Sequence, residues 1–214
     1  MKNYLLSIFS FLLISGCSAV PGANLLEDRT APTKLDNACS ILYQKPAWVK
    51  DLKEANTRYG IEYSSVLAMM YQESKFVHDA RPLKQSGAGL LSTPFASSAY
   101  GYSQALELTW AHYKRSEGVS GVRRDDFGDA AMFMGWYVSQ SEKQLGLDKN
   151  DVYAQYLAYH EGQGGYSKKS YLKKPWLLGV AKKVKARKSL YMSQLKSCNL
   201  SSLEEPNFFV RYFM

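Results

Sequence analysis

The stretch YSSVLAMMYQESKF, residues 63–76, carries the clearest structural pattern in this chain of 214 residues. Apolar side chains and one acid recur at the three- and four-residue spacing that places them on one face of an α-helix: Val66, Met69, Met70 and Glu73. The pattern predicts a helix over residues 63–74. An acid on an apolar face is uncommon, which makes Glu73 the first candidate functional residue.

Outward from this stretch the pattern stays helical, and no convincing pair of strands is present. Gly, Ser and Pro are frequent in residues 80–100, which predicts a long loop of the kind that often has a function. The sequence therefore predicts an all-α fold with one domain, residues 39–198. Helical spacing and end signals predict helices over residues 47–59, 103–115, 127–145 and 175–197. A further helix is predicted to begin at a cap, Asp148 or Asn150, and to end at about residue 159.

The first residues have the pattern of an export signal. Lys2 precedes an apolar run over residues 4–14, which is too short to span a bilayer and is followed by small residues. The segment LISGC, which ends at Cys17, resembles the lipobox of bacterial lipoproteins. It predicts a signal peptide over residues 1–16, a lipid on Cys17 and a flexible tether over residues 17–38. An ordinary signal peptide with a chance cysteine is the alternative.

Ser18 follows the cysteine where inner-membrane lipoproteins carry Asp. In signals of this type, that residue favours sorting to the outer membrane. We therefore expect the protein to be lipid-anchored at the periplasmic face of the outer membrane.

The two remaining cysteines, Cys39 and Cys198, bracket the predicted domain and leave residues 199–214 as a C-terminal tail. In an oxidising compartment the pair could form a disulfide, and two free thiols are the alternative. Their spacing fits no metal motif, and the three histidines lie far apart in the sequence. We expect no metal and no cofactor.

The chain is basic, with a formal net charge of +8. Ten Lys or Arg residues and no acid lie between Lys168 and Lys196. Such a charge favours an anionic partner, and composition alone does not choose among nucleic acid, acidic lipid and cell wall. Export argues against nucleic acid, so membrane and cell wall remain.

The apolar surroundings expected for Glu73 suggest a chemical role for its carboxyl group. Burial disfavours the charged form of a carboxyl group and raises its pKa, so the group stays protonated at higher pH. A carboxylic acid protonated near neutrality can donate a proton to a leaving oxygen, as cleavage of a glycosidic bond requires.

Three short segments follow in order: QESKF at residues 72–76, AYGYSQA at 99–105 and AYHEG at 158–162. Together they resemble the signature segments of the soluble-lytic-transglycosylase-type (SLT) domain, which shares its core fold with goose-type lysozyme. The resemblance covers Glu73 to Gly162 by motif, and the helix order fits to about residue 196. It implies a lysozyme-like helical fold and peptidoglycan glycan strands as the substrate.

Carried over by position, the resemblance makes Glu73 the catalytic acid and base. Two departures from the family pattern are His160 and Glu161, which stand where the family has Asn and Ala. Tyr166 adds an aromatic ring after the third segment. The residues expected to bind substrate are Ser74, Gly101, Tyr102, Gln104, Tyr159, Glu161 and Tyr166, with Gly101 allowing close approach to the backbone, Gln104 bonding an N-acetyl group and the Tyr159 hydroxyl near Glu73.

The activity implied is that of a lytic transglycosylase, which cleaves the bond between MurNAc and GlcNAc and leaves a 1,6-anhydro-MurNAc end without consuming water. Glu161, or the group Asp125, Asp126 and Asp129, could instead position a water molecule, which would make the protein a lysozyme-like hydrolase. A non-catalytic peptidoglycan-binding lipoprotein is the third possibility.

Overall fold

The computed structural model of the chain describes residues 29–83 and 95–204, and this part is helical, as predicted. Outside its helices the described part has two isolated bridges, Leu83 with Phe95 and Tyr100 with Ala105. The elements are α1 (Ala38–Gln44), α2 (Ala47–Tyr59), α3 (Tyr63–Ser74), α4 (Glu107–Glu117), α5 (Phe127–Leu145), α6 (Val152–Ser167), the 3₁₀ helix η1 (Ser170–Lys173), α7 (Pro175–Leu195) and α8 (Ser201–Glu204).

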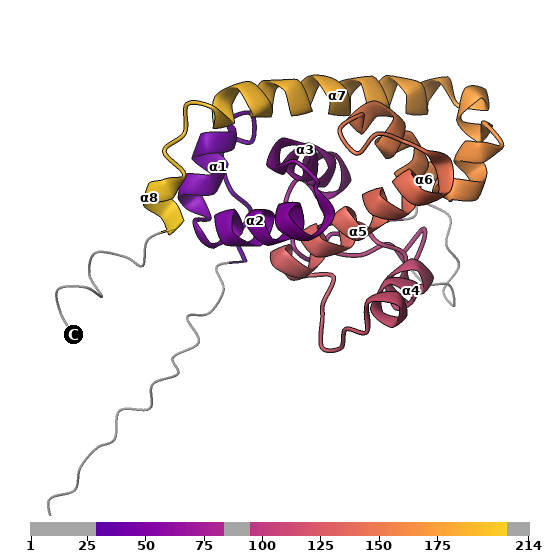
Figure 1. Cartoon of the computed structure of the whole chain (residues 1–214), viewed down its shortest axis with the longest axis horizontal. Coiled ribbons are helices and arrows are strands. Elements are labelled where there is room, and N and C mark those ends of the chain that lie inside the picture. The colour runs from indigo at the N-terminus through magenta and orange to yellow at the C-terminus, as the bar shows by residue number, and fades with distance from the viewer. Residues whose placement is uncertain (1–28, 84–94, 205–214) are drawn as a thin grey trace, which may run out of the picture.

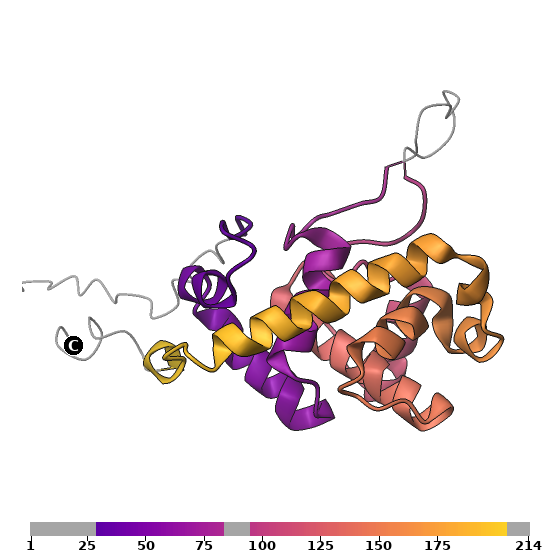
Figure 2. The same cartoon turned by 90° about the horizontal axis from the view of Figure 1, so that it is seen from above.

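The long helix α7 lies across α1, α3 and α6, as Figures 1 and 2 show from two directions. Helix α5 packs against α2 and α6. Helix α3 is the central element, because four consecutive residues, 67–70, are completely buried and so cover every side of the helix. The helix that carries Glu73 is therefore held on all sides by the core.

Aromatic rings join α2 and α5 to the segment before α4. Trp48 stacks on Phe127 with ring centroids 3.8 Å apart, and Tyr102 meets both rings edge-on at 5.8 and 5.6 Å. Helices α2 and α5 also approach closely at Gly135, where an added Cβ would lie 2.7 Å from Tyr59. These contacts fix the segment around Tyr102 to the same core as α3.

The helix predicted over residues 103–115 is wrong at its start, because α4 begins only at Glu107. Gly101 has φ 76° and Gln104 has φ 49°, and left-handed residues make a turn that cannot be the first turn of an α-helix. The helical pattern in the sequence did not reveal this turn.

The helix predicted to end near residue 159 continues as α6 to Ser167, so that boundary is also wrong. Its helical geometry breaks at Gly162 (φ 73°, ψ 157°), and helical bonding then resumes. The cap is Asp151, whose side chain accepts from the Ala154 amide at 3.3 Å, rather than Asp148 or Asn150.

The expected tether, residues 17–38, is described from residue 29 onward, and this part contacts the domain. The Gln44 side chain accepts from the backbone and the hydroxyl of Thr33. Tyr191 donates to the Leu35 carbonyl, and Arg187 pairs with Asp36 at 2.9 Å. The rest of the tether, Cys17 and residues 84–94 of the predicted loop lie outside the described residues.

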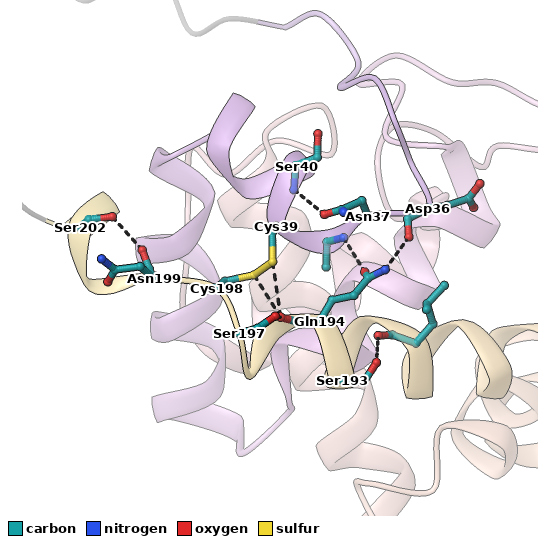
Figure 3. The surroundings of a disulfide bond; sticks show 12 residues. Asp36, Asn37, Cys39, Ser40, Ser193, Gln194, Ser197, Cys198, Asn199 and Ser202 are labelled. Carbon is teal, nitrogen blue, oxygen red and sulfur yellow. Dashed lines mark hydrogen bonds between the residues drawn. A yellow bond between two sulfur atoms is a disulfide. The ribbon is translucent and has the colours of Figure 1, made fainter.

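Cys39 and Cys198 form a disulfide, which confirms the predicted pairing. Figure 3 shows Cys39 on α1 bonded to Cys198 just beyond the end of α7, with Cα atoms 5.6 Å apart across 159 residues of sequence. Gln194 reinforces the junction, since its side chain accepts from the Ala38 amide at 2.8 Å and donates to the Asp36 carbonyl at 2.9 Å.

Within residues 29–83 and 95–204, no helix combines the length and the apolar character needed to cross a bilayer.

Candidate active site

The end of α3 is a constrained turn. Lys75 and Phe76 both have left-handed backbone angles, φ 54° and 62°, which cost free energy in residues other than glycine. The Ser74 hydroxyl donates to the Met70 carbonyl at 3.3 Å and accepts from the Phe76 amide at 3.2 Å, while the Phe76 ring is fully buried. Ser74, expected to bind substrate, thus holds the backbone that places Glu73.

Glu73 lies in the last turn of α3 and is partly buried. Burial raises the pKa of its carboxyl group to about 7, and this effect outweighs the hydrogen bond from Tyr156 and the charge of Lys75, both of which lower the pKa. The direction agrees with the prediction from its apolar helix face. A carboxyl group with this pKa can exist in both protonation states near neutral pH, as a group that donates and then accepts a proton must.

Tyr156 was missed by the sequence analysis, although its hydroxyl lies close enough to Glu73 to lower the pKa of that carboxyl group. It lies on α6, is 3% exposed and has a pKa raised by burial and by the Glu73 charge. The signal was present, because Tyr156 precedes Tyr159 by three residues and so shares its helix face.

Tyr159 lies close enough for the Glu73 charge to raise the pKa of its hydroxyl, although burial is the larger cause. Its hydroxyl donates to the Ser103 carbonyl at 2.6 Å, and its ring packs edge-on against Tyr137 at 4.9 Å. Tyr159 therefore joins α6 to the turn before α4, next to the acid.

The second sequence segment forms that turn. An added Cβ at Gly101 would lie 2.0 Å from the Arg124 carbonyl oxygen, so the close approach that this glycine allows is to Arg124. Tyr102, 1% exposed, is part of the aromatic core. Gln104 donates to the carbonyls of Ala80 and Gly101 at 2.8 and 2.9 Å. Its amide oxygen accepts no hydrogen bond from the described residues and remains suited to a ligand N–H.

A cavity of about 200 Å³ lies between this turn and α6. It brings the second and third sequence segments together, with aromatic rings and polar groups on its walls. Glu73 is outside its lining and is connected to it through Tyr159. The lining includes Gln104, Phe133, Tyr137, Tyr159, His160 and Glu161.

Glu161 has the opposite environment to Glu73. Its side chain, 3% exposed, accepts hydrogen bonds from Lys174 at 2.7 Å, from His160 at 3.0 Å and from Ser170. These donors together lower the pKa of Glu161 to about 2, although burial, the largest single effect, acts to raise it. The bonds join the third segment to η1 and to the start of α7.

The remaining candidates lie away from the cavity. The Tyr166 ring packs against Tyr171 with centroids 5.0 Å apart. Asp126 caps α5 by accepting from the Asp129 amide at 2.9 Å, and Asp125 pairs with arginines at 3.0 and 3.4 Å. In the part of the chain that the structure describes, no three His, Cys, Asp or Glu side chains are grouped to hold a metal ion.

Comparison with known families gives one match. The family model described as Transglycosylase SLT domain matches residues 5–198, nearly the whole chain, including all three segments and both bonded cysteines. No curated protein and no solved structure matches the chain.

Proposed function

Because the chain belongs to the transglycosylase SLT family, we propose that it is a peptidoglycan lytic transglycosylase with Glu73 as its only catalytic carboxyl group. The observation that carries the proposal is the setting of Glu73. It lies in the last turn of a helix whose residues 67–70 are completely buried, burial raises its pKa to about 7, and the Tyr156 hydroxyl acts on it. The all-helical, lysozyme-like fold of the family is the scaffold that holds it.

In the proposed reaction, Glu73 first protonates the glycosidic oxygen between MurNAc and GlcNAc. The substrate's own N-acetyl group stabilises the positive charge that develops at the anomeric carbon. The Glu73 carboxylate then removes the proton from the 6-hydroxyl group of MurNAc, whose oxygen bonds to the anomeric carbon. The carboxyl group is restored, and the new end is 1,6-anhydro-MurNAc.

The lowered pKa and the hydrogen bonds of Glu161 support this mechanism over hydrolysis. A hydrolase of the inverting type needs a second carboxylate that takes a proton from water, at roughly 6.5–9.5 Å from the acid. Glu161 is a weak base, since its pKa is lowered to about 2 and three side chains already donate to it. Asp125, Asp126 and Asp129 are similarly engaged with arginines and backbone amides.

The product decides between the two reactions. Purified sacculi digested with the protein should release muropeptides that end in 1,6-anhydro-MurNAc and are one water lighter than the products of lysozyme. Mass spectrometry of the soluble fraction measures this directly. Ordinary reducing ends that disappear in Glu161→Gln would identify a hydrolase, and release of no product would favour a binding protein.

We also propose that the protein is a lipoprotein of the outer membrane, facing the periplasm. The support is the lipobox-like segment that ends at Cys17, with Ser18 after it. A Cys17→Ser form should be soluble on cell fractionation and should lack the mass of the lipid. A wild-type protein that carries no lipid at Cys17 would contradict the anchor.

A further inference from the structure

A second cavity, of about 480 Å³, lies between α3 and α7 and is larger than the cavity beside Tyr159. The residues from each helix follow helical spacing, so each helix presents one face to the groove. Helix α3 contributes Tyr71 and Gln72, with Lys75 just beyond its end, and α7 contributes Lys183, Arg187 and Leu190.

The groove is cationic. Its lining contains Lys75, Lys183 and Arg187 and no Asp or Glu. Lys75 lies 4.0 Å from the centre of the Tyr71 ring, and the Arg187 guanidinium lies 3.4 Å from the same centre. Two cations therefore share one aromatic ring, and their repulsion contributes, after burial, to lowering the pKa of Lys75.

The charges of the three cations are not equally compensated. Arg187 pairs with Asp36, and Lys75 donates to the Tyr71 carbonyl at 2.7 Å. Lys183 is exposed and makes no hydrogen bond or ion pair within residues 29–83 and 95–204. An anion in the groove would reduce the repulsion and would give Lys183 a partner.

The groove lies at the same end of α3 as the proposed catalytic acid. Gln72 and Lys75 line it on either side of Glu73 in the sequence, and the Lys75 charge acts on the Glu73 carboxyl group. A ligand held here would lie at the same end of α3 as Glu73, on another side of the helix.

We propose that this groove binds a carboxylate of the stem peptide that peptidoglycan carries on MurNAc. The inference rests on the proposed function and names the part of the substrate that the groove would hold. MurNAc contributes the anomeric carbon of the cleaved bond, and its peptide starts only a few bonds away. A lipid headgroup is the other source of anions, but the face of a membrane is flat and the site is a groove between two helices.

The test compares two soluble substrates, glycan strands that carry stem peptides and the same strands stripped by an amidase. Lys183→Glu places an acid in the groove. Lys182→Glu makes the same change of charge on the neighbouring exposed residue of α7, which does not line the groove. Binding is measured by fluorescence anisotropy of labelled strands with each variant in the Glu73→Gln background, and KM and kcat are measured in the active protein.

Lys183→Glu should raise Kd and KM for peptide-bearing strands by about twofold to fivefold, as expected for one exposed charge contact, and should leave kcat unchanged. Its values for stripped strands should equal those of the wild type. Lys182→Glu should match the wild type on both substrates. Equal increases of Kd and KM in the two variants would show that the groove attracts strands only through general charge, and would overturn the proposal.

The outcomes separate this inference from the proposed function. Cleavage of both substrates with equal KM, and no selective effect of Lys183→Glu, would overturn the groove and leave the catalytic role of Glu73 intact. Selective binding of peptide-bearing strands without cleavage would support the groove and overturn the catalytic role of Glu73. Loss of binding to phosphatidylglycerol vesicles in Lys183→Glu, with strand binding unchanged, would show that the groove binds a membrane. It would overturn the proposal that the groove binds the stem peptide.

Discussion

Glu73 at the end of α3 and Glu161 in α6 are the same residue type in two regions of one molecule, with opposite electrostatics. The pKa of Glu73 is raised to about 7, and that of Glu161 is lowered to about 2. Burial acts to raise the pKa of both carboxyl groups and is the largest single effect at each. Burial alone therefore does not separate an acid that can transfer protons from one that holds structure.

The difference lies in the number and charge of the donors. Among the described residues, the neutral Tyr156 hydroxyl and the charge of Lys75 are what lower the pKa of Glu73. Glu161 accepts hydrogen bonds from Lys174, Ser170 and His160. Charged donors stabilise a carboxylate more strongly than neutral donors. The contrast can be tested in catalysis, in stability and in the pH dependence of both.

The largest effect is on catalysis. Glu73→Gln should reduce release of muropeptides from sacculi by on the order of 10²-fold or more, because an amide keeps the shape of the carboxyl group but cannot transfer a proton. Circular dichroism should show an unchanged fold. Glu161→Gln is the matched control and should keep the product type. Near-native turnover by folded Glu73→Gln would remove Glu73 from the mechanism.

The second effect is on stability. Glu161→Gln should lower the free energy of unfolding by about 1–3 kcal/mol, because it breaks buried, charge-assisted hydrogen bonds. Urea denaturation measures the change. Glu142→Gln is the control, since Glu142 pairs with Lys149 at 3.0 Å on the surface and should lose only about 0–1 kcal/mol. Equal losses in the two variants would show that the Glu161 bonds have no special weight.

The third effect is on the pH dependence of stability, and it has opposite signs. The raised pKa of Glu73 gives a contribution that is present below its unfolded pKa near 4.5 and is lost as pH rises through about 7. The lowered pKa of Glu161 gives a contribution that is present above 4.5 and is lost as pH falls through about 2.

Melting temperatures from pH 2 to pH 8 measure both contributions. Relative to the wild type, Glu73→Gln should gain stability as pH rises from 4.5 to 8. Glu161→Gln should recover stability relative to the wild type as pH falls from 4.5 towards 2. Two variants with parallel curves would contradict the contrast.

The smallest effect is on the pH profile of activity. Tyr156→Phe removes the hydrogen bond that lowers the pKa of Glu73, so that pKa should rise. The decline of kcat/KM on the alkaline side should then move to higher pH by up to about one unit, with a loss in rate below about tenfold. Tyr159→Phe is the control, because its hydroxyl donates to Ser103 instead. An unshifted profile in Tyr156→Phe would place that bond outside catalysis.

The parts of the fold that the sequence predicted are those fixed by local pattern. The predicted helices over residues 63–74 and 127–145 have the bounds of α3 and α5, because apolar spacing continues to a clear end signal such as Gly146. The start of α4 was wrong, because the turn before it depends on the Arg124 carbonyl packed against Gly101, more than twenty residues away.

In the candidate site, too, the sequence predicted what local pattern determines and missed what tertiary contacts determine. The raised pKa of Glu73 followed from its helix face alone, and the bond from Tyr156 was within reach of the helical pattern. The three donors to Glu161 come from α6, η1 and the start of α7, and η1 was not predicted at all. A network formed by the folding of three elements leaves no periodic signal in the sequence.

The disulfide between α1 and the end of α7 determines how the domain responds to a mechanical pull. Force applied through the chain before residue 29 first meets the bonds of Leu35 and Asp36 to α7, and then Cys39. From Cys39 it passes covalently to Cys198 at the end of the longest helix described here. A pull on this end of the chain is therefore shared between α1 and α7 through a covalent bond.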